Sequence, residues 1–270
     1  MKPAYNKPSL TLAEQIAEDT SLAVNNTDFD KALKQLSQSA DNKAIVKVIA
    51  LLKKNIAKLE LDTWKTGPSK NKLALYQSTF KALEKLYELK TSDDRYSFKI
   101  VIPVADRPKH LKQCLGSLLK LCQSYEYGGI KNNRYTKITV LIADDSRAQS
   151  NIDLHKKYCT EFSRKGMPTE YFGLQEQLAL VNRETADSSS LSRIISGTEG
   201  IKASTEFSHK GASIMRNITY LKLKQELSGK TDMKNTLIYF IDSDQEFCIN
   251  SPHSDKKYYA INYFHYLNEI

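Results

Sequence analysis

The sequence is poor in cysteine and has no long apolar run. Its four cysteines form no Cys-x-x-Cys pair and have no histidine at zinc-finger spacing, which excludes a zinc finger of that kind. We interpret them as reduced thiols used as small core residues. No stretch approaches the roughly 18 apolar residues of a membrane span, and residues 1–10 lack the apolar segment of a secretory signal. These absences favour a cytoplasmic protein.

Basic residues outnumber acidic ones by 40 to 31, which gives a formal net charge of +9. The excess is spread along the chain and is not gathered in a tail. A spread excess suits an anionic substrate or an acidic membrane surface. Because no nucleic-acid-binding motif accompanies the charge, nucleic acid is not expected as a partner.

Residues 1–95 have the periodicity of helices and almost no strand signal. Apolar side chains recur at three- and four-residue steps, which predicts a small α-helical N-terminal region whose apolar stripes form a core. The expected helices are residues 11–23, 28–39, 43–61 and 72–89. Four lysines interrupt the third of these stripes: Lys47, Lys53, Lys54 and Lys58. We interpret them as a solvated helix face, with peripheral contact to an acidic membrane as the alternative.

A polar hinge at residues 91–95 precedes a second part, residues 96–270, in which strand and helix signals alternate. Strands are expected at residues 98–104, 138–143, 169–172 and 237–241, and helices at 108–123, 151–164 and 211–227. Residues 174–209 are expected to form a long loop with one or two short helices. The alternation predicts an α/β domain with a parallel-rich, Rossmann-like sheet and right-handed crossovers.

Carboxylates follow three of these strands. Asp106 comes after the first strand, Asp145 after the second, and Asp242 and Asp244 after the run Leu-Ile-Tyr-Phe-Ile at 237–241. The carboxyl ends of parallel strands meet at one edge of a sheet. Because carboxylate oxygens suit hard divalent cations, this edge is where such a cation and a phosphate ligand would bind. Each acid alone would be read as an ordinary turn residue.

Four segments together resemble family 2 glycosyltransferases. Residues 100–111 read Ile-Val-Ile-Pro-Val-Ala-Asp-Arg-Pro-Lys-His-Leu, and residues 141–146 read Leu-Ile-Ala-Asp-Asp-Ser. Residues 211–217 read Gly-Ala-Ser-Ile-Met-Arg-Asn, and residues 241–244 read Ile-Asp-Ser-Asp, which is similar to the DXD motif. The resemblance implies a GT-A fold that binds a UDP- or GDP-sugar with Mn²⁺ or Mg²⁺. It further implies a hexosyltransferase-type enzyme, inverting and metal-dependent, that acts on an unknown glycan, lipid or protein acceptor.

The same resemblance assigns roles to individual residues. Asp244 would bind the metal, and Asp242 would contact the ribose or the metal through water. Asp145 would accept the N–H of the base imide. Arg216 would offer a positive charge to a phosphate or to the acids of the base site.

The first segment departs from the family pattern. Asp106 stands where the family usually has asparagine, and Ala105 stands where it usually has tyrosine, so a stacking surface for the base is missing. Pro103 is expected to shape the exit of the strand within the nucleotide-sugar site.

Lys210 and Gly211 open the expected helix at 211–227, where free N–H groups and the helix dipole favour an anion. His209 is a weaker candidate for this anion site, and His253 is a weaker candidate for the metal site.

An inverting transferase needs a general base to deprotonate the acceptor. In this family the base follows the DXD motif at some distance, and the chain stops soon after Asp244. The base is therefore expected beyond residue 270, in a longer protein. Two other functions stay open: a nucleotide-sugar-binding or interaction protein without turnover, and an aspartate-dependent phosphohydrolase.

Overall fold

The computed structural model describes residues 16, 27–38, 41–185, 207, 209–228, 234–250 and 256–270. The serine-rich stretch at 188–192 and His253 lie outside the described residues, as does all of the expected first helix except Ile16. The chain forms two compact units. Unit 1 comprises Met1–Asp94, Cys122–Gly129 and Ile249–Tyr266, and unit 2 comprises Arg95–Leu121, Ile130–Cys248 and Leu267–Ile270.

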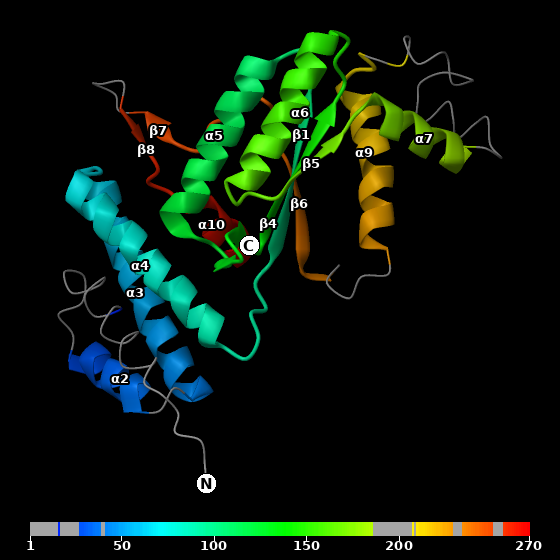
Figure 1. Cartoon of the computed structure of the whole chain (residues 1–270). Helices are drawn as coiled ribbons and strands as arrows, with labels where there is room; N and C mark the ends of the chain where they lie inside the picture. Colours follow the sequence, from blue (N-terminus) through cyan, green and yellow to red (C-terminus); the bar gives the residue numbers. More distant parts are fainter. Residues whose placement is uncertain are drawn as a thin grey trace. The chain divides into compact units, whose positions relative to one another are not determined.

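Unit 2 is built on a four-stranded sheet in which all neighbouring strands run parallel (Figure 1). Its strands are β1 (Ser97–Val104), β4 (Ile138–Asp144), β5 (Thr169–Phe172) and β6 (Thr236–Phe240), in the order β5-β4-β1-β6. The predicted α/β class and the expected adjacency of the first, second and last strands are therefore confirmed. Most residues of β1 and β4 are buried, as in strands covered on both faces.

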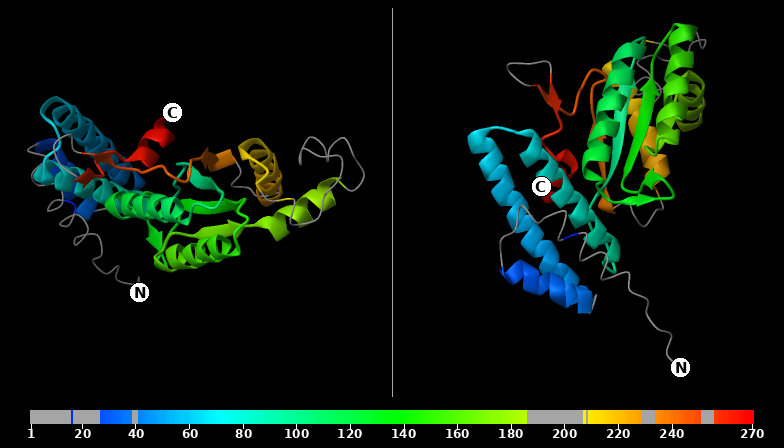
Figure 2. Two further views of the ribbon diagram at one scale, coloured as in Figure 1. Left: turned by 90° about the horizontal axis from the view of Figure 1, so that it is seen from above. Right: turned by 60° about the vertical axis from the view of Figure 1, so that its left-hand side comes forward.

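Helices cover both faces of this sheet (Figures 1 and 2). The helices α5 (Pro108–Tyr125) and α6 (Gln149–Arg164) connect β1 to β4 and β4 to β5, and they lie on one face. The helices α7 (Leu174–Thr185) and α9 (Ala212–Leu227) follow β5, and their apolar side chains share a core with Val101 and Leu141 on the other face. The strand order reverses between β1 and β6, and in such sheets this is where a ligand crevice opens.

Several short elements of unit 2 were not expected from the sequence. β2 (Ile130–Lys131) pairs with β3 (Arg134–Tyr135) in a hairpin. By contrast, α7 lies within residues 174–209, where a long loop with one or two short helices was expected. No helix among the described residues is both long and apolar enough to cross a membrane.

The described part of unit 1 contains the helices α2 (Thr27–Gln38), α3 (Asn42–Thr66) and α4 (Lys70–Leu89). Asp41 caps α3 by accepting a hydrogen bond from Ala44 N at 2.8 Å. Gly67, with φ of 82°, ends α3 and lets the chain turn into α4. The three helices confirm the helical periodicity expected for residues 28–89.

Two later segments pack with these helices. Tyr259 O accepts hydrogen bonds from Gln77 Nε2 at 2.9 Å and from Tyr125 Oη at 2.7 Å. Unit 1 also holds the short pair β7 (Ile249–Asn250) and β8 (Lys257–Tyr258), and it contains the start of α10 (Tyr263–Glu269). The sequence-based division placed all of residues 96–270 in one domain, whereas here residues 122–129 and 249–266 belong with the N-terminal helices.

Candidate functional site

A cleft of about 540 Å³ opens at the carboxyl end of the sheet in unit 2. This volume lies within the usual range for ligand sites. Its lining comes from the end of β1, from the loops after β1, β4 and β6, and from the residues that lead into and begin α9. The lining residues are Pro103, Val104, Ala105, Arg107, Asp145, His209, Gly211, Ala212, Met215, Asp242, Ser243 and Asp244.

The loop after β6 presents Asp242 and Asp244 to solvent, and both line the cleft. A turn closed by Gln245 N donating to Asp242 O at 3.0 Å shapes this loop. Two contacts with α5 hold it in place: Cys114 Sγ donates to Asp242 O at 3.8 Å, and Phe247 N donates to Ser117 Oγ at 2.7 Å. Burial, and then the nearby charge of Asp244, raises the pKa of the Cys114 thiol to about 12, so the thiol remains a donor.

The end of β1 and the loop after it supply another part of the lining. Pro103 and Ala105 line the cleft, and Arg107 Nη1 lies 3.9 Å from Asp244 Oδ2. Ala105 offers only a methyl group where the resembling family has an aromatic ring. Arg107 lies in the first segment quoted above, but no role was expected for it.

Asp106 does not line the cleft; its backbone has a φ of 51° and its carboxylate turns to the segment after β4. Oδ1 accepts from Ala148 N at 3.0 Å and Asn151 Nδ2 at 3.1 Å, and Oδ2 accepts from Arg147 N at 3.1 Å. His209 Nε2 lies 2.6 Å from the same Oδ2. Burial opposes ionisation, but these hydrogen bonds together hold the pKa of Asp106 well below its usual range. Asp106 therefore joins the loop after β1 to the segment after β4 and to His209. From the sequence we expected it to contact a nucleotide.

Asp145 lines the cleft and is nearly buried, with its side chain 6% exposed. Its Oδ1 accepts a hydrogen bond from Lys210 Nζ at 2.6 Å, and its Oδ2 accepts one from Gly211 N at 3.2 Å. Gly211 has a φ of 87°, which a residue without a Cβ adopts readily. Burial lowers the pKa of Lys210, and the Asp145 charge works against that shift. Lys210 and Asp145 therefore form a buried pair of opposite charges beside the cleft.

His209 links two of these loops. Its backbone N donates to Asp145 O at 3.1 Å, and its ring contacts Asp106. The segment before α9 is thereby tied to the ends of both β1 and β4. His209 was a weak candidate from the sequence, and Lys210 was expected only to favour an anion at the start of the helix.

Asp144 precedes Asp145 and is held by contacts of its own. Its carboxylate accepts hydrogen bonds from Ser146 N and Tyr171 Oη, both at 2.9 Å, and contacts His155 Nδ1 at 2.9 Å. Burial raises the pKa of Asp144, but its bonds to His155 and Ser146 outweigh this and lower it. Among the described residues no partner contacts His155 Nε2, although the ring is fully buried.

Arg216 is exposed on α9 and is not among the residues that line the cleft. Of the predicted nucleotide-sugar and metal residues, Pro103, Asp145, Asp242 and Asp244 therefore line one cleft, and Asp106 and Arg216 do not. Arg107 lines the cleft, and Lys210 contacts the lining residue Asp145. Each contacts an acid from a distant loop, Arg107 contacting Asp244 and Lys210 contacting Asp145, so these positions follow only from the folded chain.

The described part of the chain holds no cluster of three or more His, Cys, Asp or Glu side chains arranged to bind a metal. Asp242 and Asp244 remain as an exposed pair of oxygen donors at the cleft. Hard divalent cations that also bind phosphate commonly use one or two protein carboxylates together with water. The donor set therefore fits a metal bound together with a diphosphate ligand.

No protein-family model, curated protein or solved structure matches this chain.

Proposed function

We propose that this protein is a metal-dependent glycosyltransferase with a GT-A fold, which transfers a sugar from a nucleotide-diphosphate donor to a glycan, lipid or protein acceptor with inversion. One observation carries the proposal. Each of the four segments that resemble family 2 glycosyltransferases contributes residues to the same cleft, although they span residues 100–244. Three of these segments meet because parallel strands end at one edge of the sheet, and residues 211–217, which open α9, join them at the same cleft.

The cleft also lies where ligands bind in open parallel sheets. It opens between the carboxyl ends of β1 and β6, at the point where the strand order reverses. Asp242 and Asp244 would hold Mn²⁺ or Mg²⁺ there. When bound, such an ion acts as a Lewis acid that stabilises the charge on the leaving diphosphate.

The protein's own residues would bind and orient the donor. Arg107 is exposed beside Asp244 and presents a guanidinium to a phosphate oxygen. Asp145 would accept the N–H of the base, and its contacts with Lys210 and Gly211 hold its carboxylate in a single orientation. Each carboxylate oxygen can accept more than one hydrogen bond, so these contacts leave capacity for a ligand.

The main alternative is a protein that binds a nucleotide sugar without turnover. The proposal assigns no general base, so slow donor hydrolysis is the reaction that separates the two functions. Hydrolysis that requires metal and is lost in Asp244→Ala supports an enzyme. A phosphohydrolase is less favoured because its DXD motif ends the first strand of the fold, whereas Asp242 and Asp244 follow β6, the last strand of the parallel sheet.

Calorimetric titration tests the proposal. UDP and then GDP are titrated into the wild type and Asp244→Ala, with and without Mn²⁺. We expect binding of one nucleotide that needs Mn²⁺ and is lost in the variant. Asp94→Ala is the matched control because Asp94 is an exposed carboxylate, paired with Lys90 and outside the cleft. Absence of binding to either nucleotide, or binding that survives in Asp244→Ala, would overturn the proposal.

A further inference from the structure

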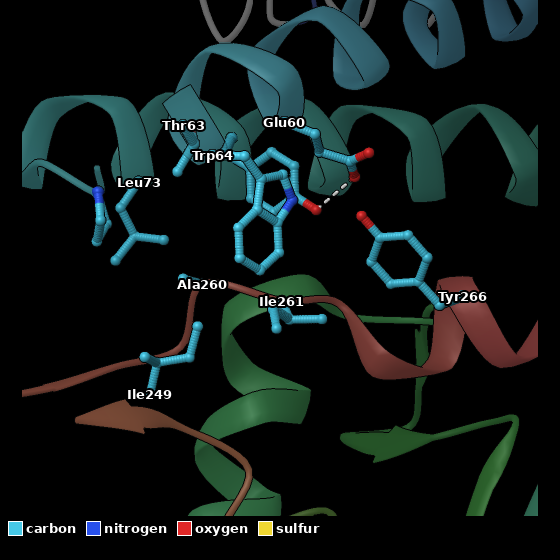
Figure 3. Close-up of a pocket in the computed structure, with 10 residues that line it drawn as sticks. Glu60, Thr63, Trp64, Leu73, Ile249, Ala260, Ile261 and Tyr266 are labelled. Carbon is cyan, nitrogen blue, oxygen red and sulfur yellow. Dashed lines mark hydrogen bonds between the residues drawn. The ribbon is translucent and has the colours of Figure 1, made fainter. Parts of the chain in front are cut away.

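Unit 1 contains a second pocket that the proposed function does not use. It has a volume of about 140 Å³ and lies between α3, α4 and the later residues Ile249, Ala260, Ile261 and Tyr266 (Figure 3). Its lining is mainly apolar and includes Trp64, Leu73 and Ile261. The pocket is much smaller than the cleft in unit 2, so it suits a small group and not a nucleotide.

One charged side chain reaches this pocket among its described lining residues. Glu60 Oε1 accepts a hydrogen bond from Tyr76 Oη at 2.7 Å. The hydroxyl of Tyr266 points toward the same carboxylate (Figure 3). Burial, and then the bond to Glu60, raises the pKa of Tyr76, so its hydroxyl stays neutral and donates. The Glu60 carboxylate thus lies beside two tyrosine rings, and the hydrogen bond from Tyr76 fixes the position of its Oε1.

Aromatic rings line the pocket and also pack behind its lining residues. Trp64 lines it although the residue is 71% exposed, which is unusual for the largest side chain. Tyr76 packs edge-on against Phe80 with ring centroids 5.0 Å apart, and Phe80 packs on His265 at 4.9 Å. These contacts fix the floor, so Tyr76 cannot readily rotate away from Glu60.

We propose that this pocket binds a small organic cation, an ammonium group on a hydrocarbon body of about six carbons. The negative Glu60 and the faces of aromatic rings both attract an ammonium ion. A cavity of about 150 Å³ holds a benzene ring, so the hydrocarbon body fits the volume available. The inference is independent of the proposed function, since it uses residues of unit 1 alone.

Trp64 is the single tryptophan of the chain and so reports directly on the pocket. Benzylamine, benzyl alcohol and benzoate are titrated into the full chain, followed by tryptophan fluorescence and by calorimetry. The three probes share a ring but differ in charge. We expect benzylamine to bind at least about tenfold more tightly than benzyl alcohol, because it adds a charge-assisted hydrogen bond and a cation–π contact. Benzoate should not bind.

The variant Glu60→Gln keeps the shape of the side chain and an oxygen acceptor for Tyr76. It should remove the preference for benzylamine over benzyl alcohol. Asp62→Asn is the control, since Asp62 lies on the same helix, pairs with Lys72 and does not line the pocket. Equal binding of the amine and the alcohol, an unchanged preference in Glu60→Gln, or no binding of any probe would each overturn the inference.

Discussion

Arg107 Nη1 lies 3.9 Å from Asp244 Oδ2, so the loop after β1 and the loop after β6 meet at the cleft of unit 2. Both side chains are more than half exposed, at 61% and 57%. An exposed ion pair of this kind contributes about 1 kcal/mol or less to stability. Both charges are therefore available to a ligand at little cost to the fold.

Replacing Arg107 should weaken nucleotide binding more than replacing Arg216. We expect Arg107→Ala to lower the affinity for the bound nucleotide about tenfold or more, because a charge-assisted contact with phosphate is lost. Arg216→Ala should leave the affinity unchanged, since Arg216 does not line the cleft. Calorimetry at two salt concentrations measures both variants. A loss confined to Arg216→Ala would instead support the role that the sequence assigned to that residue.

Removing Lys210 should destabilise the protein strongly. Lys210→Met leaves the buried Asp145 carboxylate without its cation, and breaking a buried pair in this way typically costs about 3–5 kcal/mol. The free energy of unfolding is measured by denaturant titration. The control is Lys165→Met, which breaks the exposed pair with Glu161 and should cost about 0.5 kcal/mol or less. Equal losses in the two variants would contradict the importance of the buried pair.

Asp106 should make stability depend on pH in the acid range. Its pKa is lower in the folded protein than its ordinary value, so the unfolded chain binds more protons as the pH falls. The stabilisation is therefore complete above the ordinary pKa of about 4 and is lost as the pH falls toward the folded value. Asp106→Asn should be about 1–2 kcal/mol less stable at pH 7. Melting temperatures from pH 7 to pH 3 should converge for variant and wild type, and parallel curves would contradict this origin of the pH dependence.

The lysines of α3 should behave as a solvated face. Lys47, Lys54 and Lys58 are exposed, and Lys53 is partly buried. We expect replacement of all four by glutamine to leave co-sedimentation with anionic vesicles unchanged. Lysines at an acidic membrane contribute about 1 kcal/mol each, so a real contact would be lost almost completely in this variant. Such a loss would establish the membrane alternative.

The sheet was predictable because each of its strands is a recognisable run of apolar residues. β1, β4, β5 and β6 each begin and end within one residue of the expected bounds. Buried parallel strands read as continuous apolar runs, and such runs need no information from the rest of the chain. The two-residue strands β2 and β3 carry no comparable pattern, and they form only because the chain turns back on itself there.

The site was predictable where a residue directly follows a strand. Asp145, Asp242 and Asp244 line the cleft because the ends of parallel strands meet at one edge. Asp106 also follows a strand, but its positive φ turns the carboxylate away from the cleft. Arg216 follows the buried, cleft-lining Met215 by one residue, and one residue of helix rotates a side chain by about 100°.

His209 and Lys210 could not be assigned from local pattern. Their partners Asp106 and Asp145 lie 103 and 65 residues away in the chain. The resemblance of residues 211–217 placed this segment near the base site, but it gave no partner for His209 or Lys210. The same reason applies to the residues 249–266 of unit 1, which are joined to the N-terminal helices by contacts such as the one between Gln77 and Tyr259.

The discontinuous make-up of unit 1 has a consequence for synthesis and for cleavage. Chains are made from the N-terminus, so α2, α3 and α4 leave the ribosome long before residues 249–266 are available to complete their unit. The apolar surfaces that await those residues stay open to chaperones while nearly all of unit 2 is translated. For the same reason, a protease cut in the 91–95 hinge does not release unit 1 as one piece. It divides that unit into two chains held together only by their packing.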